Sequence, residues 1–164
     1  MGHMQLLPEA VIFDFGGTLV DTSTIDHLVA GHHPACDAPE ADRFHVESLL
    51  CPPVRQVVRL LELERSIGRR IIIVAASRDH YRPHLQSWLD LHSIAADEIH
   101  LRQVSDHRPD ALTKRELVAG VQERHHVIHA YESRPDVARA YERLGIPVTL
   151  TGGALPSHRV AAAA

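Results

Sequence analysis

Cysteine is scarce in this chain, which carries only Cys36 and Cys51 among 164 residues. Their spacing matches no metal-binding pattern, and in a sequence without a signal peptide we expect both to be reduced thiols. Histidine is more abundant, with 14 residues, but the pairs His32-His33 and His125-His126 lack the i, i+4 spacing that presents two zinc ligands on one helix face. We therefore expect surface histidines and no zinc site.

Long apolar runs and an excess of positive charge are also absent. No run approaches the ~20 residues that span a membrane, so we expect a soluble, cytoplasmic protein with no membrane partner. The net charge of -4 argues against binding nucleic acid by bulk electrostatics, although it leaves a local basic groove open. Hydrophobic residues at 45% and charged residues at 23% are globular values, which predict an ordered chain.

One stretch near the start carries the strongest chemical signal. The apolar run from Ala10 to Phe13 predicts a strand buried on both faces, and it ends in Asp14, followed by Gly16-Gly17 and Thr18. In open parallel α/β sheets, ligands bind at the carboxyl ends of the strands. Asp14 is therefore a metal ligand, a nucleophile or a residue that caps a turn, since aspartate and glycine are also common turn formers.

The rest of the chain alternates helix and strand patterns. After irregular residues 22–53, with helical stretches at 25–30 and 41–50, we expect helices at 52–67, 81–91, from 109 onwards and at 135–144. Strands are expected at 71–76, 98–101, 127–131 and 146–150. This order predicts an α/β fold with a doubly wound parallel sheet. Residues 5–150 are expected to form one domain, with 1–4 an expression-vector remnant and 151–164 a flexible tail.

The motif around Asp14 resembles the first motif of the haloacid dehalogenase (HAD) superfamily. The resemblance implies that Asp14 is the nucleophile that becomes an aspartyl-phosphate, with donors supplied by the Gly17 backbone and by Thr18. It also implies a HAD-type Rossmannoid fold in which 22–53 is a small helical cap; a plain connecting loop is the alternative. The position at which the superfamily's phosphatases usually carry a second aspartate, as general acid and base, is Gly16.

The later motifs of the superfamily fall at the ends of the expected strands. The second motif implies phosphate binding by Ser77 and Arg78, although the strict hydroxyl position is Ala76. The third motif implies that Lys114 pairs with the nucleophile and the phosphate. The fourth, Glu132-Ser133, implies that Asp14 and Glu132 hold Mg²⁺, with a serine in place of the usual second aspartate.

The resemblance narrows to the 3′-phosphatase domain of polynucleotide kinases. It rests on the stretches Phe44 to Ser48, Ser77 to Asp79, Trp88-Leu89, Leu101-Arg102, Asp106 to Asp110 with Lys114, Glu132 to Pro135 and Gly145 to Pro147. It implies Mg²⁺-dependent removal of phosphate from a nucleic-acid end or a phosphorylated small molecule, with Arg108 as a further substrate-binding residue.

Three departures from the family pattern keep other functions open. Gly16 removes the proton donor for a poor leaving group, and Ser133 and Ala76 remove a metal ligand and a phosphate ligand. The chain is then a phosphohydrolase that prefers good leaving groups, such as aryl or acyl phosphates. The alternatives are a catalytically impaired relative that binds phosphate ligands or proteins, and a HAD hydrolase of another type that lacks the second aspartate.

Overall fold

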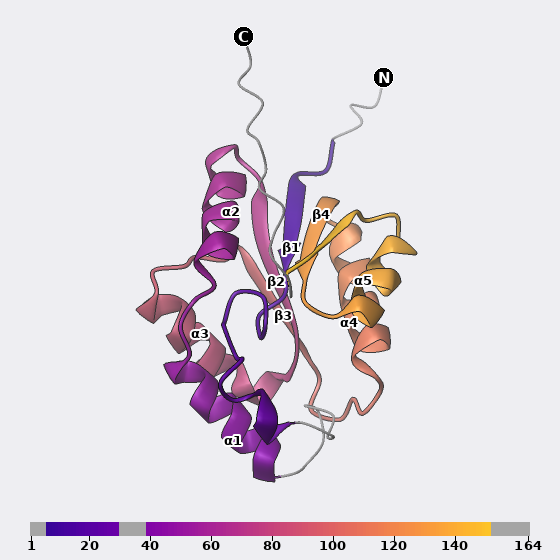
Figure 1. Cartoon of the computed structure of the whole chain (residues 1–164). Helices are drawn as coiled ribbons and strands as arrows, with labels where there is room; N and C mark the ends of the chain where they lie inside the picture. The colour runs from indigo at the N-terminus through magenta and orange to yellow at the C-terminus, as the bar shows by residue number, and fades with distance from the viewer. Residues whose placement is uncertain (1–5, 30–38, 152–164) are drawn as a thin grey trace, which may run out of the picture.

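The computed structural model describes residues 6–29 and 39–151 (Figure 1). Residues 1–4, residues 152–164 of the expected tail, Cys36 and the pair His32-His33 lie outside these ranges. The strands are β1 (Glu9–Phe13), β2 (Arg70–Arg78), β3 (Glu98–Arg102), β4 (His126–Glu132) and β5 (Val148–Leu150). The helices are α1 (Pro39–Glu47), α2 (Arg55–Ser66), α3 (Arg82–Leu91), α4 (Asp110–Gln122) and α5 (Pro135–Glu142), with 3₁₀ turns η1 (Asp26–Leu28), η2 (Ser48–Leu50) and η3 (Asp79–Tyr81).

The five strands form one parallel sheet in the order β3-β2-β1-β4-β5, which confirms the predicted doubly wound topology. The chain leaves β1 towards β2 and β3 and then crosses to β4 on the other side of β1. The carboxyl ends of β1 and β4 therefore flank the point where the winding reverses, which is the place where open α/β sheets bind ligands.

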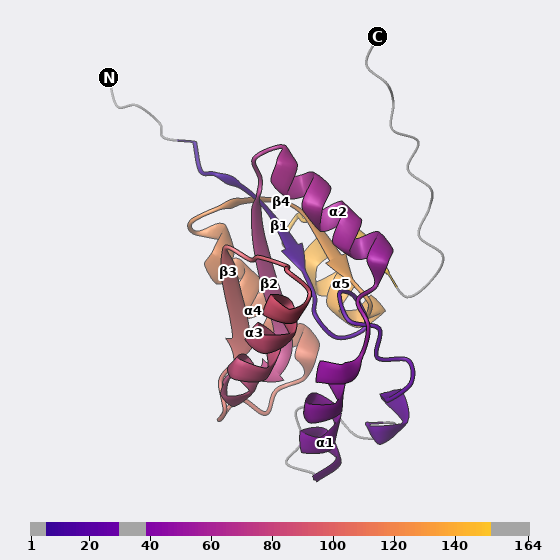
Figure 2. The ribbon, with the colours of Figure 1, turned by 90° about the vertical axis from the view of Figure 1, so that its left-hand side faces the viewer.

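Helices cover both faces of the sheet (Figures 1 and 2). Alternate residues of β1 point to opposite faces, so that Val11 and Phe13 join one core and Ala10 and Ile12 join the other. The first core takes α2 and α3, and the second takes α4 and α5. Asp14 follows directly at the end of this doubly buried strand, so the two cores fix its position from both sides.

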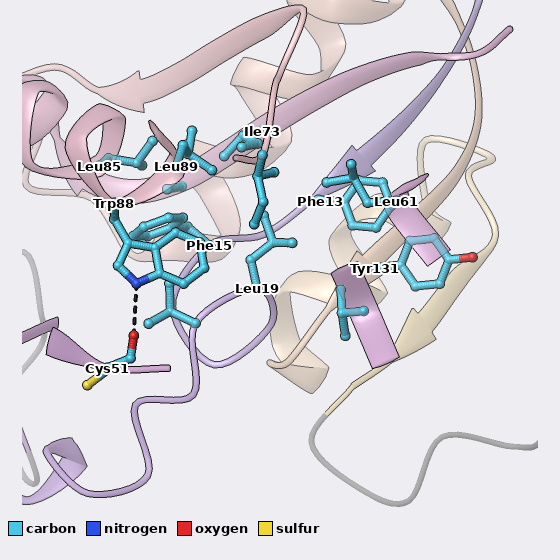
Figure 3. Packing of buried hydrophobic residues seen from close by; sticks show 14 of the residues in the cluster. Phe13, Phe15, Leu19, Cys51, Leu61, Ile73, Leu85, Trp88, Leu89 and Tyr131 are labelled. Carbon is cyan, nitrogen blue, oxygen red and sulfur yellow. Dashed lines mark hydrogen bonds between the residues drawn. The ribbon is translucent and has the colours of Figure 1, made fainter. Parts of the chain in front are cut away.

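Trp88 packs in the first core and ties the cap segment to the sheet. Its ring is buried and meets Phe15 edge-on, with ring centroids 5.3 Å apart. Its indole N–H donates a 2.9 Å hydrogen bond to the carbonyl oxygen of Cys51, at the end of the segment (Figure 3). Backbone hydrogen bonds from Asp21 to Pro52 and from Val54 to Leu19 close the base of the same segment. Within the described residues, 22–53 therefore carry short helices at the carboxyl end of the sheet (Figure 2).

Several element boundaries differ from the sequence prediction by one to three residues. Helix α2 begins at Arg55 and not at Pro52, because residues 52–54 run extended to pair with the loop after β1. Strand β2 continues through Ser77 to Arg78, and β5 begins at Val148 and not at Ile146. Within the described residues, no helix is both long enough and apolar enough to span a membrane.

Candidate active site

Asp14 lies at the carboxyl end of β1 and is almost completely buried. Its backbone N–H donates to the carbonyl oxygen of Tyr131, which holds it beside the end of β4. The chain then turns tightly, and the carbonyl oxygen of Phe15 accepts hydrogen bonds from the N–H groups of Thr18, Leu19 and Val20. This turn brings the Thr18 hydroxyl back to Asp14, where it donates a 3.0 Å hydrogen bond to Oδ2.

Gly17 provides a turn conformation that other residues adopt with difficulty. Its φ is +80°, and a Cβ atom there would come within 3.0 Å of the Ser133 Oγ. Gly16 is different, because a Cβ atom at that position would meet only the Cγ2 of Thr22, at an ordinary distance of 4.0 Å. The fold thus needs glycine at position 17 and has room for a side chain at position 16.

Lys114 is the cation of the site. It lies on the buried face of α4, one helical turn before Val118, and the spacing 114, 118, 121 is that of an amphipathic helix. Its Nζ lies 2.6 Å from Oδ1 of Asp14 and 2.8 Å from Oε2 of Glu132. Burial by itself lowers the pKa of Lys114, but the two carboxylates outweigh it and hold the pKa above its ordinary value. The ammonium group is therefore permanently charged and bridges both acids.

Glu132 lies behind Asp14 and is completely buried. Its Oε1 accepts the backbone N–H groups of Ser133 and Arg134, at 2.9 and 3.1 Å, while Oε2 accepts Lys114. Burial raises the pKa of Glu132 and the Asp14 carboxylate raises it further, against the opposing effect of Lys114. Both oxygens are thus engaged by protein donors.

The other side of Asp14 faces three further oxygen atoms. The Oγ of Ser133 lies 3.4 Å from both Oδ2 of Asp14 and the carbonyl oxygen of Gly16. Thr151 lies beside them, with its Oγ1 3.2 Å from that of Thr18 and its backbone N–H bonded to Glu132. Thr151 is buried, so the first residue of the expected tail belongs structurally to this site.

A cavity of about 400 Å³ opens above Asp14. Its lining comes from the loop after β1, the cap segment, the end of β2, the start of α4 and the residues after β4. These residues are Asp14, Gly16, Gly17, Thr22, Asp26, Val29, Phe44, His45, Ala75, Ala76, Ser77, Asp110, Lys114, Ser133 and Arg134. Predicted residues Asp14, Gly17, Ser77 and Lys114 therefore line one cavity. Thr18 and Glu132 do not line it, but Thr18 donates to Asp14 and Glu132 accepts from Lys114.

Arg134 is a cavity residue that the sequence reasoning missed. Its guanidinium is held by both oxygens of Asp136 and by Oδ2 of Asp110. Asp110 is in turn held by Nη2 of the fully buried Arg102. Burial lowers the pKa of Arg134, but the two aspartates outweigh it and raise the pKa overall. The sequence could have indicated Arg134, because it directly follows Glu132-Ser133 at the same edge of the sheet.

Arg78 and Arg108 are not among the residues that line this cavity. Arg78 is buried and its Nη2 lies 3.2 Å from Nδ1 of His107, in the loop between β3 and α4. Arg108 is half exposed and pairs with Asp106 and Glu116. Both arginines thus contact residues of that loop or of α4, and their predicted roles in phosphate binding remain predictions.

Comparisons with known proteins identify the family and the fold of this chain. Residues 8–151 match the model of a family described as the polynucleotide kinase PNKP phosphatase domain. The match confirms the resemblance inferred from the motifs. No curated protein matches the chain at a significant level.

Several solved structures share the fold. A chain of the Pnkp1/Rnl/Hen1 complex has a TM-score of 0.72 and 23% sequence identity, over 90% of this chain and 47% of that one. A putative beta-phosphoglucomutase from Thermotoga maritima has a TM-score of 0.59 and 19% identity, over 85% and 83%. A haloacid dehalogenase-like hydrolase from Streptococcus pneumoniae has a TM-score of 0.59 and 17% identity, over 88% and 84%. The present chain thus spans about half the length of the chain in the Pnkp1/Rnl/Hen1 complex.

Proposed function

Because the chain belongs to the polynucleotide kinase PNKP phosphatase-domain family of the HAD superfamily, we propose that it hydrolyses phosphoric monoesters through a covalent intermediate on Asp14. The observation that carries the proposal is the buried pairing of Lys114 with Asp14 and Glu132 at the junction of β1 and β4, open to a cavity. An ion pair that only stabilised the fold would not require a cavity beside the Asp14 carboxylate.

The chain's own residues account for the first step. Lys114 and Thr18 hold the two oxygens of Asp14 in one orientation, at 2.6 and 3.0 Å. A carboxylate oxygen of Asp14 attacks phosphorus, the bond to the leaving oxygen breaks, and the electron pair goes to that oxygen. The Lys114 ammonium offsets the negative charge that accumulates when a phosphate approaches Asp14. Water then attacks the same phosphorus atom, which releases inorganic phosphate and restores Asp14.

The oxygen atoms around Asp14 fit a magnesium ion. Mg²⁺ takes oxygen ligands, and one or two carboxylates with waters and substrate phosphate suffice in many enzymes. Asp14, Gly16 and Ser133 line the cavity, and the Ser133 Oγ lies 3.4 Å from both Oδ2 of Asp14 and the Gly16 carbonyl oxygen. Glu132 does not line the cavity, and both of its carboxylate oxygens accept hydrogen bonds from protein donors. We propose that Asp14, the Gly16 carbonyl and Ser133 hold the ion and that Glu132 acts mainly through Lys114. When bound, Mg²⁺ would neutralise phosphate charge and align the phosphoryl group.

Nucleic-acid 3′ ends are the substrate class that we propose. The support is the family match and the likeness to a chain in a structure described as an RNA repair complex, which spans 91% of this chain. The cavity adds Arg134 as a cation and Phe44 as an aromatic side chain on the cap, the residue types that bind phosphate and nucleobase.

Phosphate release tests the proposal. Wild-type protein, Asp14→Asn and the matched surface variant Asp90→Asn are assayed with an aryl phosphate and with a 3′-phosphorylated oligonucleotide, with Mg²⁺ and with a chelator. We expect metal-dependent turnover that Asp14→Asn abolishes and Asp90→Asn leaves unchanged. Equal rates for wild type and Asp14→Asn, with both folded, would contradict the proposal and favour a phosphate-binding module, the function that Gly16 and Ser133 otherwise suggest.

A further inference from the structure

The absent second aspartate raises the question of which group protonates the leaving oxygen. In phosphoryl transfer, the attacking and leaving oxygens lie roughly in line on opposite sides of phosphorus. With Asp14 at the sheet edge, the leaving oxygen points away from the sheet and towards the cap. Gly16 carries no side chain there, and the cap residues that line the cavity are Thr22, Asp26, Val29, Phe44 and His45.

On the basis of the function proposed above, we propose that His45 of the cap segment is the general acid and base. It would replace the aspartate that other HAD phosphatases usually carry at the position of Gly16. It is a titratable residue that lines the cavity on the side of the segment between β1 and α2, and it lies on α1, which packs against η1. Imidazole is the side chain best suited to donate and accept a proton near neutral pH.

The position of His45 is fixed by packing. The side chain is buried, and its ring stacks on Tyr81 with centroids 4.0 Å apart and planes inclined by 30°. Phe44 meets it edge-on at 5.6 Å. Tyr81 is itself buried, and its hydroxyl donates to Asp42 on α1. The stack therefore joins α1 to η3, the turn that follows β2, and holds the imidazole in one orientation.

Other titratable groups surround this stack and define its electrostatics. His80 and His84 lie against the same Tyr81 ring, at centroid distances of 3.9 and 5.9 Å. Asp42 binds the Tyr81 hydroxyl from α1, and Asp26 reaches the cavity from η1. Asp26 is the competing candidate for the proton donor. It is exposed, however, and no ring stack fixes its side chain, so His45 is the better oriented group.

His45 donates the proton that the first step requires and regains a proton in the second step. In the first step, the Asp14–phosphorus bond forms, the bond from phosphorus to the leaving oxygen breaks, and the imidazolium gives its proton to that oxygen. The alcohol leaves and the imidazole is neutral. In the second step, the imidazole removes a proton from water, the water oxygen bonds to phosphorus and the phosphorus–Asp14 bond breaks. Inorganic phosphate leaves, and the imidazolium and the carboxylate are restored.

A leaving-group comparison tests the role of His45. His45→Asn is expected to lower kcat for a 3′-phosphorylated oligonucleotide, an alkyl phosphomonoester whose leaving group is the sugar 3′-alkoxide, by about 100-fold or more, the usual contribution of a general acid. The same variant should lower kcat for p-nitrophenyl phosphate only a few-fold, because that leaving group needs no proton. His27→Asn, which changes a histidine of η1 that does not line the cavity, is the matched control and should leave both rates unchanged.

Restoring the aspartate gives a second, independent test. Position 16 has room for a side chain, so Gly16→Asp should raise the alkyl-ester rate. In that background, His45→Asn should have less than a tenth of its effect in the wild type, because two acids then compete for one role. Circular dichroism and Trp88 fluorescence confirm that each variant is folded.

The outcomes separate this inference from the proposed function. Equal losses on both substrates in His45→Asn, an unchanged penalty in the Gly16→Asp background, or a selective alkyl-ester loss in Asp26→Asn instead would overturn the role of His45. In those cases, Asp14-dependent turnover still upholds the proposed function. Wild-type protein that hydrolyses only the aryl ester would overturn the role of His45, and turnover without dependence on Asp14 would overturn both.

Discussion

The hydroxyl group of Thr18 is completely buried and lies between Oδ2 of Asp14 and the hydroxyl of Thr151. Hydrogen bonds to charged groups contribute about 1.5–3 kcal/mol. We predict that Thr18→Val lowers kcat for an aryl phosphate about 10- to 100-fold with little change in KM, because Asp14 loses a donor that orients it. Thr18→Ser keeps the hydroxyl and should retain most of the activity. Steady-state kinetics of both variants check this, and equal losses would point to packing and not to the hydrogen bond.

Lys114 is the single lysine of the sequence, and it holds two buried carboxylates together. Removing one partner of a buried ion pair typically costs about 3–5 kcal/mol, since an uncompensated charge is left behind. We predict that Lys114→Met lowers the free energy of unfolding by this amount. The double variant Lys114→Met/Glu132→Gln removes one of the two stranded charges and should recover part of the loss. Urea denaturation followed by Trp88 fluorescence gives both values, and no recovery would contradict this account.

At the level of elements, Glu98 links the start of β3 to the residues after α4. Its carboxylate accepts hydrogen bonds from His125, His100 and Arg124, at 2.6, 2.7 and 2.9 Å. Burial alone raises the pKa of Glu98, but these donors outweigh it and lower the pKa from the ordinary 4.5 to about 2. The unfolded chain therefore binds a proton at higher pH than the folded chain does, and stability falls as the pH drops between these two values.

We predict that, between pH 4.5 and pH 2, the free energy of unfolding of the wild type falls by about 2 kcal/mol more than that of Glu98→Gln. This amount allows for the partial exposure of the carboxylate. Urea denaturation at a series of pH values measures it, with Glu62→Gln on the exposed side of α2 as control. Parallel acid profiles for wild type and Glu98→Gln would show that Glu98 is not responsible.

The order of elements could be predicted from the sequence because buried parallel strands and amphipathic helices carry strong, local patterns. Asp14 could be predicted because it directly follows such a strand, and Lys114 because it matches the third motif of the superfamily near the start of an expected helix. The helix start at Arg55 could not, since it depends on the pairing of residues 52–54 with the distant loop after β1.

Over the whole molecule, the residues that escaped prediction depend on partners far away in the sequence. The direction of a long arginine side chain is set by the acids or rings near it, so Arg78 turns to His107 while Arg134 reaches Asp110. Thr151 enters the site only because β5 pairs with β4. His45 enters it because α1 lies at the carboxyl end of the sheet (Figure 2).

The central claim is that Asp14 accepts the phosphoryl group, and trapping that intermediate tests it most directly. Protein mixed with p-nitrophenyl phosphate and Mg²⁺ is quenched in acid within its first turnover, digested and mapped by mass spectrometry. We predict one added phosphoryl group on Asp14, lost on treatment with hydroxylamine and absent from Asp14→Asn. Phosphate release without any phosphoryl group on Asp14, or with the group on another residue, would contradict the account.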